Sequence, residues 1–380
     1  MATVPNEPTP PSPVTLSDVA RLAGVAVSTV SRALTRPGRV NAATAQRIFE
    51  AAETLGYRHS ALPSPKREHD LNRIIAITVA DMANPVYASY AAEAQRLSLS
   101  RGFGLHVIDF RESAAAERTM IGLSLKHVDG FILASSRMPE HGIRKLASMT
   151  PVVAMNRPVK GVRSILADPR RGLDDMLARL RALGHDSLTY LAGPVTSWQD
   201  GSRWSLLMEL CPRHGIRLSR LTSPSPTYQG GYRCLDAFLA HPTSAVLGFN
   251  DSIAIGFNAA LRDAGVRVPE QVSVVGIDDI PVDPLLTPRL STIRLDRRTA
   301  GRRAMELMLD MVAPRAEGAP GPASDISGTI SETDVEPEVV SDSTFVERDT
   351  TGPARGHLTH VAPSVSPSSS RDAIPDVQSL

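Results

Sequence analysis

The spacing of apolar and polar positions changes at about residue 72. From there on, apolar runs of three to six residues are typical of buried strands; they are Ile74–Val79, Leu105–Asp109, Phe131–Leu133, Val152–Met155, Ile165–Ala167, Leu188–Ala192, Ala245–Phe249 and Val272–Ile277. Helical stretches lie among them, at Ala88–Ser100, Arg170–Leu183, Arg203–His214, Gly230–Ala240, Ser252–Ala264 and Arg297–Val312. Alternating strands and helices build βαβ units, whose strands pair in parallel. The pattern therefore predicts an α/β fold with parallel sheets.

The segment that precedes this region has the spacing of short helices. A first helix is predicted over Leu16–Ala23, with Gly24 in the turn that follows, because glycine tolerates a positive φ. A second helix runs from Val27 to Leu34, and a third, over Thr44–Leu55, follows Asn41, which is a good N-cap. A short joint that contains glycine is what a helix-turn-helix requires.

The second of these helices has two distinct faces when it is projected at 100° per residue. Positions expected to close the small helical core are Val30, Ala33, Leu34, Ile48, Phe49, Ala52 and Leu55. The opposite face of the second helix holds Val27, Ser28, Ser31 and Arg32, and it is free to enter a major groove. Helix–glycine–helix patterns are common, so a three-helix bundle with no role in DNA binding remains an alternative at this point.

Stretches rich in proline or in acidic residues set the remaining boundaries. The predicted parts are a disordered arm at 1–14, a helix-turn-helix domain at 15–60, a linker at 61–71, a second domain at 72–353 and a disordered tail at 354–380. Within the second domain, residues 313–344 hold seven acids against one base and are predicted to be a disordered insertion. A last short strand is expected at Phe345–Val346.

Charge is distributed unevenly. The chain carries a net charge of +1, yet residues 15–67 hold eight Arg and Lys against three acids, a local net charge of +5 that attracts phosphates. The two cysteines, Cys211 and Cys234, are too few for a disulfide framework and indicate reduced thiols. Residues 1–14 lack the apolar core of a signal peptide, and no apolar run has the roughly 18 residues of a membrane span, so a cytoplasmic protein is expected.

Sequence patterns of common enzymes are missing. The chain has no GxxxxGK[ST] phosphate loop, no GxSxG and no HExxH. The carboxylate pair Asp278–Asp279 has no nucleophile or metal-binding cluster beside it in the sequence. We therefore expect no enzymatic activity, no cofactor and no bound metal.

Three stretches of the helical segment carry a family resemblance: Val14–Leu34, Pro37–Val40 and Leu55–Tyr57. Over some forty residues they strongly resemble the headpiece of the LacI/GalR family of bacterial repressors. The resemblance implies that the second helix is a recognition helix. By position, Val27 and Ser28 match base-reading residues at its start, and Arg32 is the best candidate for a hydrogen bond to a base edge.

The same resemblance implies contacts to the DNA backbone. Thr15, Thr29 and Asn41 fit phosphate contacts, which fix the register of the protein on the duplex. Tyr57 fits a backbone contact as well, with packing against the third helix as an equally good alternative.

Two departures from the family pattern affect DNA binding. Ala26 stands where the family usually has a serine, and alanine neither caps the recognition helix nor donates to a phosphate. The family's hinge helix inserts a leucine into the minor groove, whereas Lys66 occupies that position here and Pro63 and Pro65 disfavour a helix. Lys66 is instead expected to make a salt-dependent phosphate contact.

The region from residue 72 to residue 312 resembles the family's core, which is similar to periplasmic sugar-binding proteins. Motifs that carry this resemblance are Asp81–Pro85, Val128–Ile132, Gly184–His185, Leu191–Pro194, Phe249–Asp251, Gly276–Ile280 and Leu290–Ile293. The resemblance implies two doubly wound parallel-sheet lobes with a ligand cleft between them.

Ligands of open α/β sheets bind beyond the carboxyl ends of the strands, where this sequence repeatedly places polar residues. The expected ligand-binding residues are Asp81, Tyr87, Asn156, Asp168, Arg203, Asp251 and Asp278. Asp and Asn side chains with an Arg suit a polyhydroxylated ligand such as a sugar. Arg203 and Asp251 are assigned by their match to family positions. Asn84, Asp168 and Asp251 also fit a helix-capping role, and Tyr87, Trp198 and Tyr228 fit either stacking on a sugar or core packing.

Together these features predict a DNA-binding transcriptional repressor that responds to a small polar ligand. A single helix-turn-helix reads one half-site, so a homodimer on a pseudo-palindromic operator is expected. The alternative is a constitutive DNA-binding regulator with a decayed effector site. A solute-binding transport protein fits poorly, because it needs a signal peptide and no headpiece.

Overall fold

The computed structural model describes residues 14–35, 40–55, 57, 71–312, 336–341 and 343–354. The chain divides into two compact units, Met1–Asp70 and Leu71–Leu380. Each unit is treated by itself below.

The first unit contains three helices: α1 (Leu16–Ala23), α2 (Val27–Thr35) and α3 (Ala42–Thr54). Gly24 ends α1 with φ of 66°, the left-handed conformation expected of the turn. Buried apolar side chains from all three helices form the core, including Val19, Val30 and Ile48. Phe49 was predicted to lie in this core, but its side chain is 45% exposed, because Ile48 and Ala52 occupy the inward face of α3.

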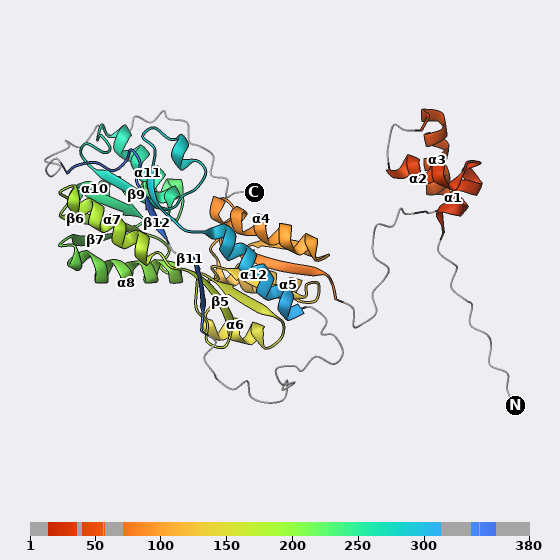
Figure 1. Ribbon diagram of the computed structural model, residues 1–380, viewed down its shortest axis with the longest axis horizontal. Coiled ribbons are helices and arrows are strands. Elements are labelled where there is room, and N and C mark those ends of the chain that lie inside the picture. The colour runs from red at the N-terminus through yellow and green to blue at the C-terminus, as the bar shows by residue number, and fades with distance from the viewer. Residues whose placement is uncertain are drawn as a thin grey trace. The chain divides into compact units, whose positions relative to one another are not determined.

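The second unit has two lobes, each built on a six-stranded sheet. Lobe 1 has the strand order β11-β5-β4-β3-β1-β2, and all neighbouring strands pair in parallel. Its strands are β1 (Ile74–Val79), β2 (Gly104–Asp109), β3 (Gly130–Ala134), β4 (Val152–Met155), β5 (Arg163–Ala167) and β11 (Glu338–Ser341). Its helices are α4 (Pro85–Ser100), α5 (Ala114–Ser124), α6 (Glu140–Ala147) and α12 (Arg297–Val312). Figure 1 shows α4 and α12 side by side on this lobe.

Lobe 2 has the strand order β12-β10-β9-β8-β6-β7, with only β12 antiparallel among its described strands. Its strands are β6 (Ser187–Ala192), β7 (Arg217–Thr222), β8 (Ala245–Gly248), β9 (Ser273–Asp278), β10 (Ser291–Arg294) and β12 (Thr344–Val346). Its helices are α7 (Arg170–Ala182), α8 (Trp198–Arg213), α9 (Tyr228–Tyr232), α10 (Leu235–Ala240), α11 (Asp251–Asp263) and the 3-10 turn η1 (Asp283–Leu285). Two doubly wound, largely parallel lobes confirm the predicted fold class.

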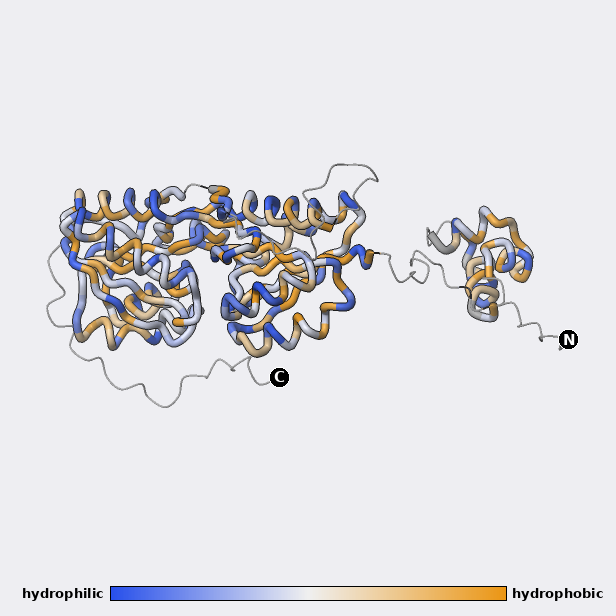
Figure 2. Tube along the Cα trace, turned by 90° about the horizontal axis from the view of Figure 1, so that it is seen from below, coloured by the Kyte–Doolittle hydropathy of each residue, from blue (hydrophilic) through white to orange (hydrophobic). Residues whose placement is uncertain are grey.

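Apolar residues lie along the strands, while hydrophilic residues lie on the outer helix faces, as Figure 2 shows. One apolar cluster of lobe 1 packs beneath α4 and α12, and a second contains residues of α5 and α6. A third fills lobe 2. The chain passes between the lobes after β5, after β10 and after β11. Among the described residues, no helix has both the length and the apolar character needed to cross a membrane.

Three expectations about elements need correction. Glu338–Ser341 lies inside the predicted disordered insertion yet forms β11, because an edge strand needs little apolar sequence and Glu338 pairs with Arg303 of α12 at 2.7 Å. The helix predicted over Gly230–Ala240 is two helices, α9 and α10. Helices α5 and α6 and strands β7 and β10 have no counterpart among the predicted elements.

Candidate functional site

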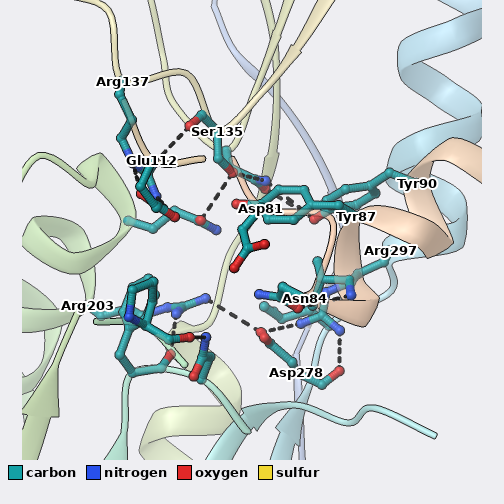
Figure 3. A pocket seen from close by; sticks show the side chains of 17 residues that line it. Asp81, Asn84, Tyr87, Tyr90, Glu112, Ser135, Arg137, Arg203, Asp278 and Arg297 are labelled. Atoms are coloured by element: carbon teal, nitrogen blue, oxygen red, sulfur yellow. Dashed lines mark hydrogen bonds and ion pairs between the residues drawn. The ribbon is translucent and has the colours of Figure 1, made fainter. Parts of the chain in front are cut away.

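A pocket lies between the two lobes, at the carboxyl ends of their strands (Figure 3). Lobe 1 lines it with Asp81, Asn84, Val86, Tyr87, Tyr90, Glu112, Ser135, Arg137, Asn156 and Arg297. The remaining lining residues are Gln199, Arg203, Pro226, Phe249, Asn250, Asp278 and Leu295. The space that a water molecule can enter is about 20 Å³, and the pocket measures about 490 Å³ when the open space at its mouth is counted. Its position is where open α/β sheets bind their ligands.

Four of the lining residues have a positive φ although they are not glycine. The angles are 60° at Glu112, 66° at Ser135, 62° at Asn156 and 138° at Asp278. Residues other than glycine rarely adopt these conformations, and such strain concentrates at functional sites. The strain therefore marks this pocket independently of its residue types.

Asp278 is the electrostatic centre of the lobe 2 side of the pocket. Arg297 donates to its carboxylate, and the Arg203 Nη2 lies 3.8 Å from Asp278 Oδ1. Burial raises the pKa of Asp278, and the two guanidinium groups oppose that rise. Arg203 also donates to the Phe249 carbonyl and lies 4.6 Å from the centre of the Phe249 ring. This arrangement fixes both guanidinium groups.

On the lobe 1 side, Arg137 forms a bidentate pair with Glu112, with N–O distances of 2.6 and 3.0 Å. It also donates to the Ser135 carbonyl at 2.8 Å. Asn156 donates to the Ser135 hydroxyl at 2.9 Å, which holds its amide at the pocket wall. Burial raises the pKa of Tyr87 to about 12, so its hydroxyl keeps its proton and remains a hydrogen-bond donor.

The charges that line the pocket balance. Asp81, Glu112 and Asp278 supply three carboxylates, and Arg137, Arg203 and Arg297 supply three guanidinium groups. Such a lining offers many donors and acceptors without a net charge, which suits a neutral polyhydroxylated molecule. No group of His, Cys, Asp and Glu residues in the described part of the chain is arranged to hold a metal ion.

A second pocket adjoins the first and shares Asn156, Gln199 and Arg203 with it. Its other lining residues are Leu166, Ala167, Asp168, Pro169, Trp198, Ser202 and Val339. Asp168 therefore lies in this second pocket. Its Oδ1 accepts from the Arg170 backbone N–H at 2.9 Å just before α7, although the N-cap of that helix is Pro169.

The first unit exposes the predicted recognition face. In α2, Ser28 and Arg32 are exposed and Val27 is 43% exposed, while Val30 and Ala33 are buried. Thr29 is half-buried.

The predicted phosphate contacts lie at helix starts or on the core. The Thr15 hydroxyl donates to Asp18 at 2.7 Å, and hydrogen bonds from Thr15 lower the pKa of Asp18. Asn41 caps α3 by accepting from the Ala43 N–H at 2.9 Å, as its sequence position predicts. Tyr57 is half-buried and packs on the core, so the packing alternative is present. Lys66, Pro63 and Pro65 lie outside the described residues.

Comparisons with known proteins agree with both units. Residues 15–60 match the family described as bacterial regulatory proteins, lacI family, and residues 177–335 match the periplasmic binding protein-like domain. The HTH-type transcriptional repressor CytR of Escherichia coli (strain K12) is 28% identical over 316 residues, which cover 80% of this chain and 92% of that protein. The HTH-type transcriptional regulator AscG of the same strain is 30% identical over 294 residues, which cover 74% of this chain and 87% of that protein. The chain belongs to the LacI family.

A solved structure titled as a complex of the transcriptional regulator CelR with cellobiose is 26% identical to this LacI-family chain. It superposes with a TM-score of 0.60 and covers 89% of this chain and 99% of its own. The predicted function, a DNA-binding transcriptional repressor modulated by a small ligand, is confirmed at the level of the family. Its relatives are transcriptional repressors and regulators, in agreement with the expectation that the chain is not an enzyme.

The structure brings most of the predicted ligand residues of this LacI-family chain together. Asp81, Tyr87, Asn156, Arg203 and Asp278 all line the first pocket. Asp251 does not, and the expectation is corrected. Its side chain is fully buried, with hydrogen bonds from Thr292 at 2.6 Å and from the Ile280 N–H at 3.1 Å.

The neighbouring Asn250 lines the pocket instead and caps α11 by accepting from the Ile253 N–H. The cap therefore lies one residue earlier than the sequence indicated, which turns Asp251 inward.

Glu112, Ser135, Arg137 and Arg297 line the pocket but were not predicted. The first three follow β2 and β3, so the rule that found Asp81 would have found them had it been applied to every strand. Arg297 had no comparable signal. It begins α12, which returns to lobe 1, and only the packed structure brings it to Asp278 in lobe 2.

Proposed function

We propose that this LacI-family repressor binds a neutral sugar in the cleft between its lobes and thereby changes its affinity for operator DNA. The observation that carries the proposal is the charge-balanced, hydrogen-bonding lining of the first pocket. A neutral sugar has many hydroxyl groups and no charge, so it satisfies such a lining without leaving a buried ion unpaired. The similar CelR structure, which is titled as a cellobiose complex, supports the same class of ligand.

We further propose that the active form is a cytoplasmic homodimer on a pseudo-palindromic operator. A single headpiece reads one half-site, and two-fold pairing of the chain matches two half-sites. In this proposal Arg32 hydrogen-bonds a base edge, and Val27 and Ser28 contact bases beside it. Backbone contacts that fix the register come from Thr15, Thr29, Asn41, Tyr57 and Lys66.

Calorimetry on the full chain tests the ligand proposal. The panel consists of neutral monosaccharides and disaccharides, nucleosides and sugar phosphates. We expect heat of binding from a neutral sugar and a weaker response from its phosphate, because the phosphate brings two negative charges into a balanced cleft. Binding of phosphates alone would contradict the proposal. No heat from any compound, together with tight DNA binding, would favour a constitutive regulator with a decayed effector site.

A further inference from the structure

The two adjoining pockets differ in the character of their walls. The first is lined by paired carboxylates and guanidinium groups, whereas the second contains two exposed apolar side chains, Trp198 and Val339. The second pocket is the roomier of the two, because the space that a water molecule can enter is about 120 Å³ there and about 20 Å³ in the first pocket. Three residues belong to both linings, so the cleft continues from one pocket into the other.

Trp198 is held at the wall of the second pocket. It is the first residue of α8, and the Ser197 side chain caps this helix by accepting from the Asp200 N–H. The indole is 38% exposed. The other tryptophan, Trp204, lies on the same helix but stacks on Tyr190 at 6.2 Å and against Arg220 at 5.1 Å. Trp204 is therefore packed against neighbouring side chains, whereas Trp198 on the same helix faces the second pocket.

The remaining wall comes from both lobes. Val339 of β11 is 57% exposed and belongs to lobe 1. Asp168, Gln199 and Ser202 place polar side chains on the same lining. An aromatic face with a few polar groups around it is the arrangement by which proteins hold a ring that is apolar on one face and polar at its edge.

We propose that this second pocket is a subsite for the second ring of a disaccharide, stacked on Trp198 and hydrogen-bonded through Asp168, Gln199 and Ser202. The first ring occupies the charge-balanced pocket, so the inference rests on the function proposed above. Trp198 is then the residue that selects a disaccharide over a monosaccharide.

The test uses the full chain carrying Trp204→Phe, because the sequence has only two tryptophans and Trp198 then supplies all indole fluorescence. Trp204 lines neither pocket, so this background keeps the binding residues intact. The probes are glucose against cellobiose and maltose, and galactose against lactose. We expect one disaccharide to bind at least about tenfold more tightly than its monosaccharide and to shift the emission of Trp198.

Variants at Trp198 separate stacking from folding. Trp198→Ala should lower the affinity for the disaccharide about tenfold and leave the affinity for the monosaccharide unchanged. The unchanged monosaccharide affinity also shows that the cleft is folded in this variant. Trp198→Phe keeps an aromatic face and should retain most of the preference for the disaccharide.

Equal affinities for monosaccharide and disaccharide, or equal weakening of both by Trp198→Ala, would overturn the subsite while the sugar proposal stands. Tight binding of a nucleoside with no disaccharide binding would overturn it as well. If no sugar of either size binds, both proposals fail.

Discussion

Asp278 and its two arginine partners determine the charge of the cleft. Arg203 and Arg297 approach the same carboxylate from different elements. The loss of that carboxylate therefore leaves two buried guanidinium groups without their shared negative partner. A cleft altered in this way has a surplus positive charge. It should then prefer an anion over a neutral molecule.

Asp278→Asn is therefore expected to lower the affinity for the neutral sugar at least about tenfold and to raise the affinity for the corresponding sugar phosphate. The matched control is Asp279→Asn. Asp279 pairs with Arg294 and Arg348 and does not line the pocket, so its substitution should leave both affinities unchanged. Calorimetry of both variants checks the prediction, and an unaltered preference in Asp278→Asn would speak against a charge-balanced ligand site.

At the other end of the chain, Arg32 is the residue with the strongest prediction for base recognition. Arg32→Ala should lower operator affinity by about 1–3 kcal/mol and relax the preference at one base position. Arg47→Ala, on the exposed side of α3, serves as the control for a general loss of positive charge. Gel-shift titrations against operator variants distinguish the loss of base recognition from a general loss of positive charge. An equal loss for every DNA sequence in Arg32→Ala would rule out base reading by this residue.

Among the elements, α9 and α11 depend on glycine for their contact. A Cβ on Gly231 would stand 2.0 Å from the Ile253 carbonyl oxygen, and one on Gly256 would stand 1.9 Å from the Tyr228 carbonyl oxygen. The two helices thus approach each other backbone to backbone, which any larger side chain prevents.

Gly231→Ala should lower the stability of the second unit by roughly 2 kcal/mol or more, because the backbone of α11 has to move. Gly201→Ala is the control, since a Cβ there meets nothing within 4 Å and the residue lies inside α8. That control should raise stability by roughly 0.5–1 kcal/mol. Melting temperatures of both variants test this pair, and a neutral Gly231→Ala would show that the helices are less tightly packed than described.

A buried carboxyl pair lies between η1 and α11: Asp283 is the first residue of η1, and Asp251 is the first residue of α11. Asp283 is fully buried, and its carboxyl group lies against that of Asp251. Burial raises its pKa to about 6, and burial together with the neighbouring Asp283 raises the pKa of Asp251 well above its usual value. Asp278, Asp279 and Arg348 are the other charged groups that act on this pair.

Because the folded-state pKa of Asp283 is raised, its protonated form contributes stability that is complete below about pH 4 and is lost as the pH rises through about 6. Asp283→Asn has no proton to lose. It should be more stable than the parent chain by roughly 1–3 kcal/mol at pH 7.5, and this difference should shrink at pH 4.5. Melting curves at the two pH values check this. A difference that does not change with pH would contradict the assigned role of the pair.

Most strands were predictable because each is a short, mainly apolar run. Ile74–Val79 and Val152–Met155 match β1 and β4 to the residue. Strand β7 was not predicted, because it is an edge strand on which only Leu218 and Leu221 are half-buried and the other residues are exposed. The sequence also missed α6, which buries only Ile143 and Leu146. Elements that bury few side chains leave a weak pattern in the sequence.

The site was predictable where a polar residue directly follows a strand, as Asp81 and Asn156 do. Arg297 was not, because its place in the cleft depends on α12 returning to the first lobe. The sequence also cannot show which of two adjacent polar residues turns inward. Asn250 and Asp251 differ in role because Asn250 caps α11 and Asp251 hydrogen-bonds Thr292 in the interior.

At the scale of the whole molecule, chain crossings and side-chain contacts join the two lobes at the cleft. The chain passes between the lobes after Ala167, Arg294 and Ser341, and groups of both lobes meet across the pocket. Examples are Arg297 with Asp278, and the Ser135 hydroxyl, which donates to Gln199 at 3.3 Å. A ligand that replaces such contacts favours one arrangement of the lobes over another, and it changes DNA affinity by its difference in affinity for the two arrangements.

The central claim is that ligand and operator binding are coupled in one chain, and linkage requires this coupling to be reciprocal. Its most direct test is the operator affinity of the full chain, measured by fluorescence anisotropy with and without a saturating sugar, on a site selected from random-sequence DNA. We expect a change of about 5- to 150-fold, matched by an equal change in sugar affinity when operator is saturating. Sequence-specific DNA binding that stays the same at saturating sugar would contradict the account.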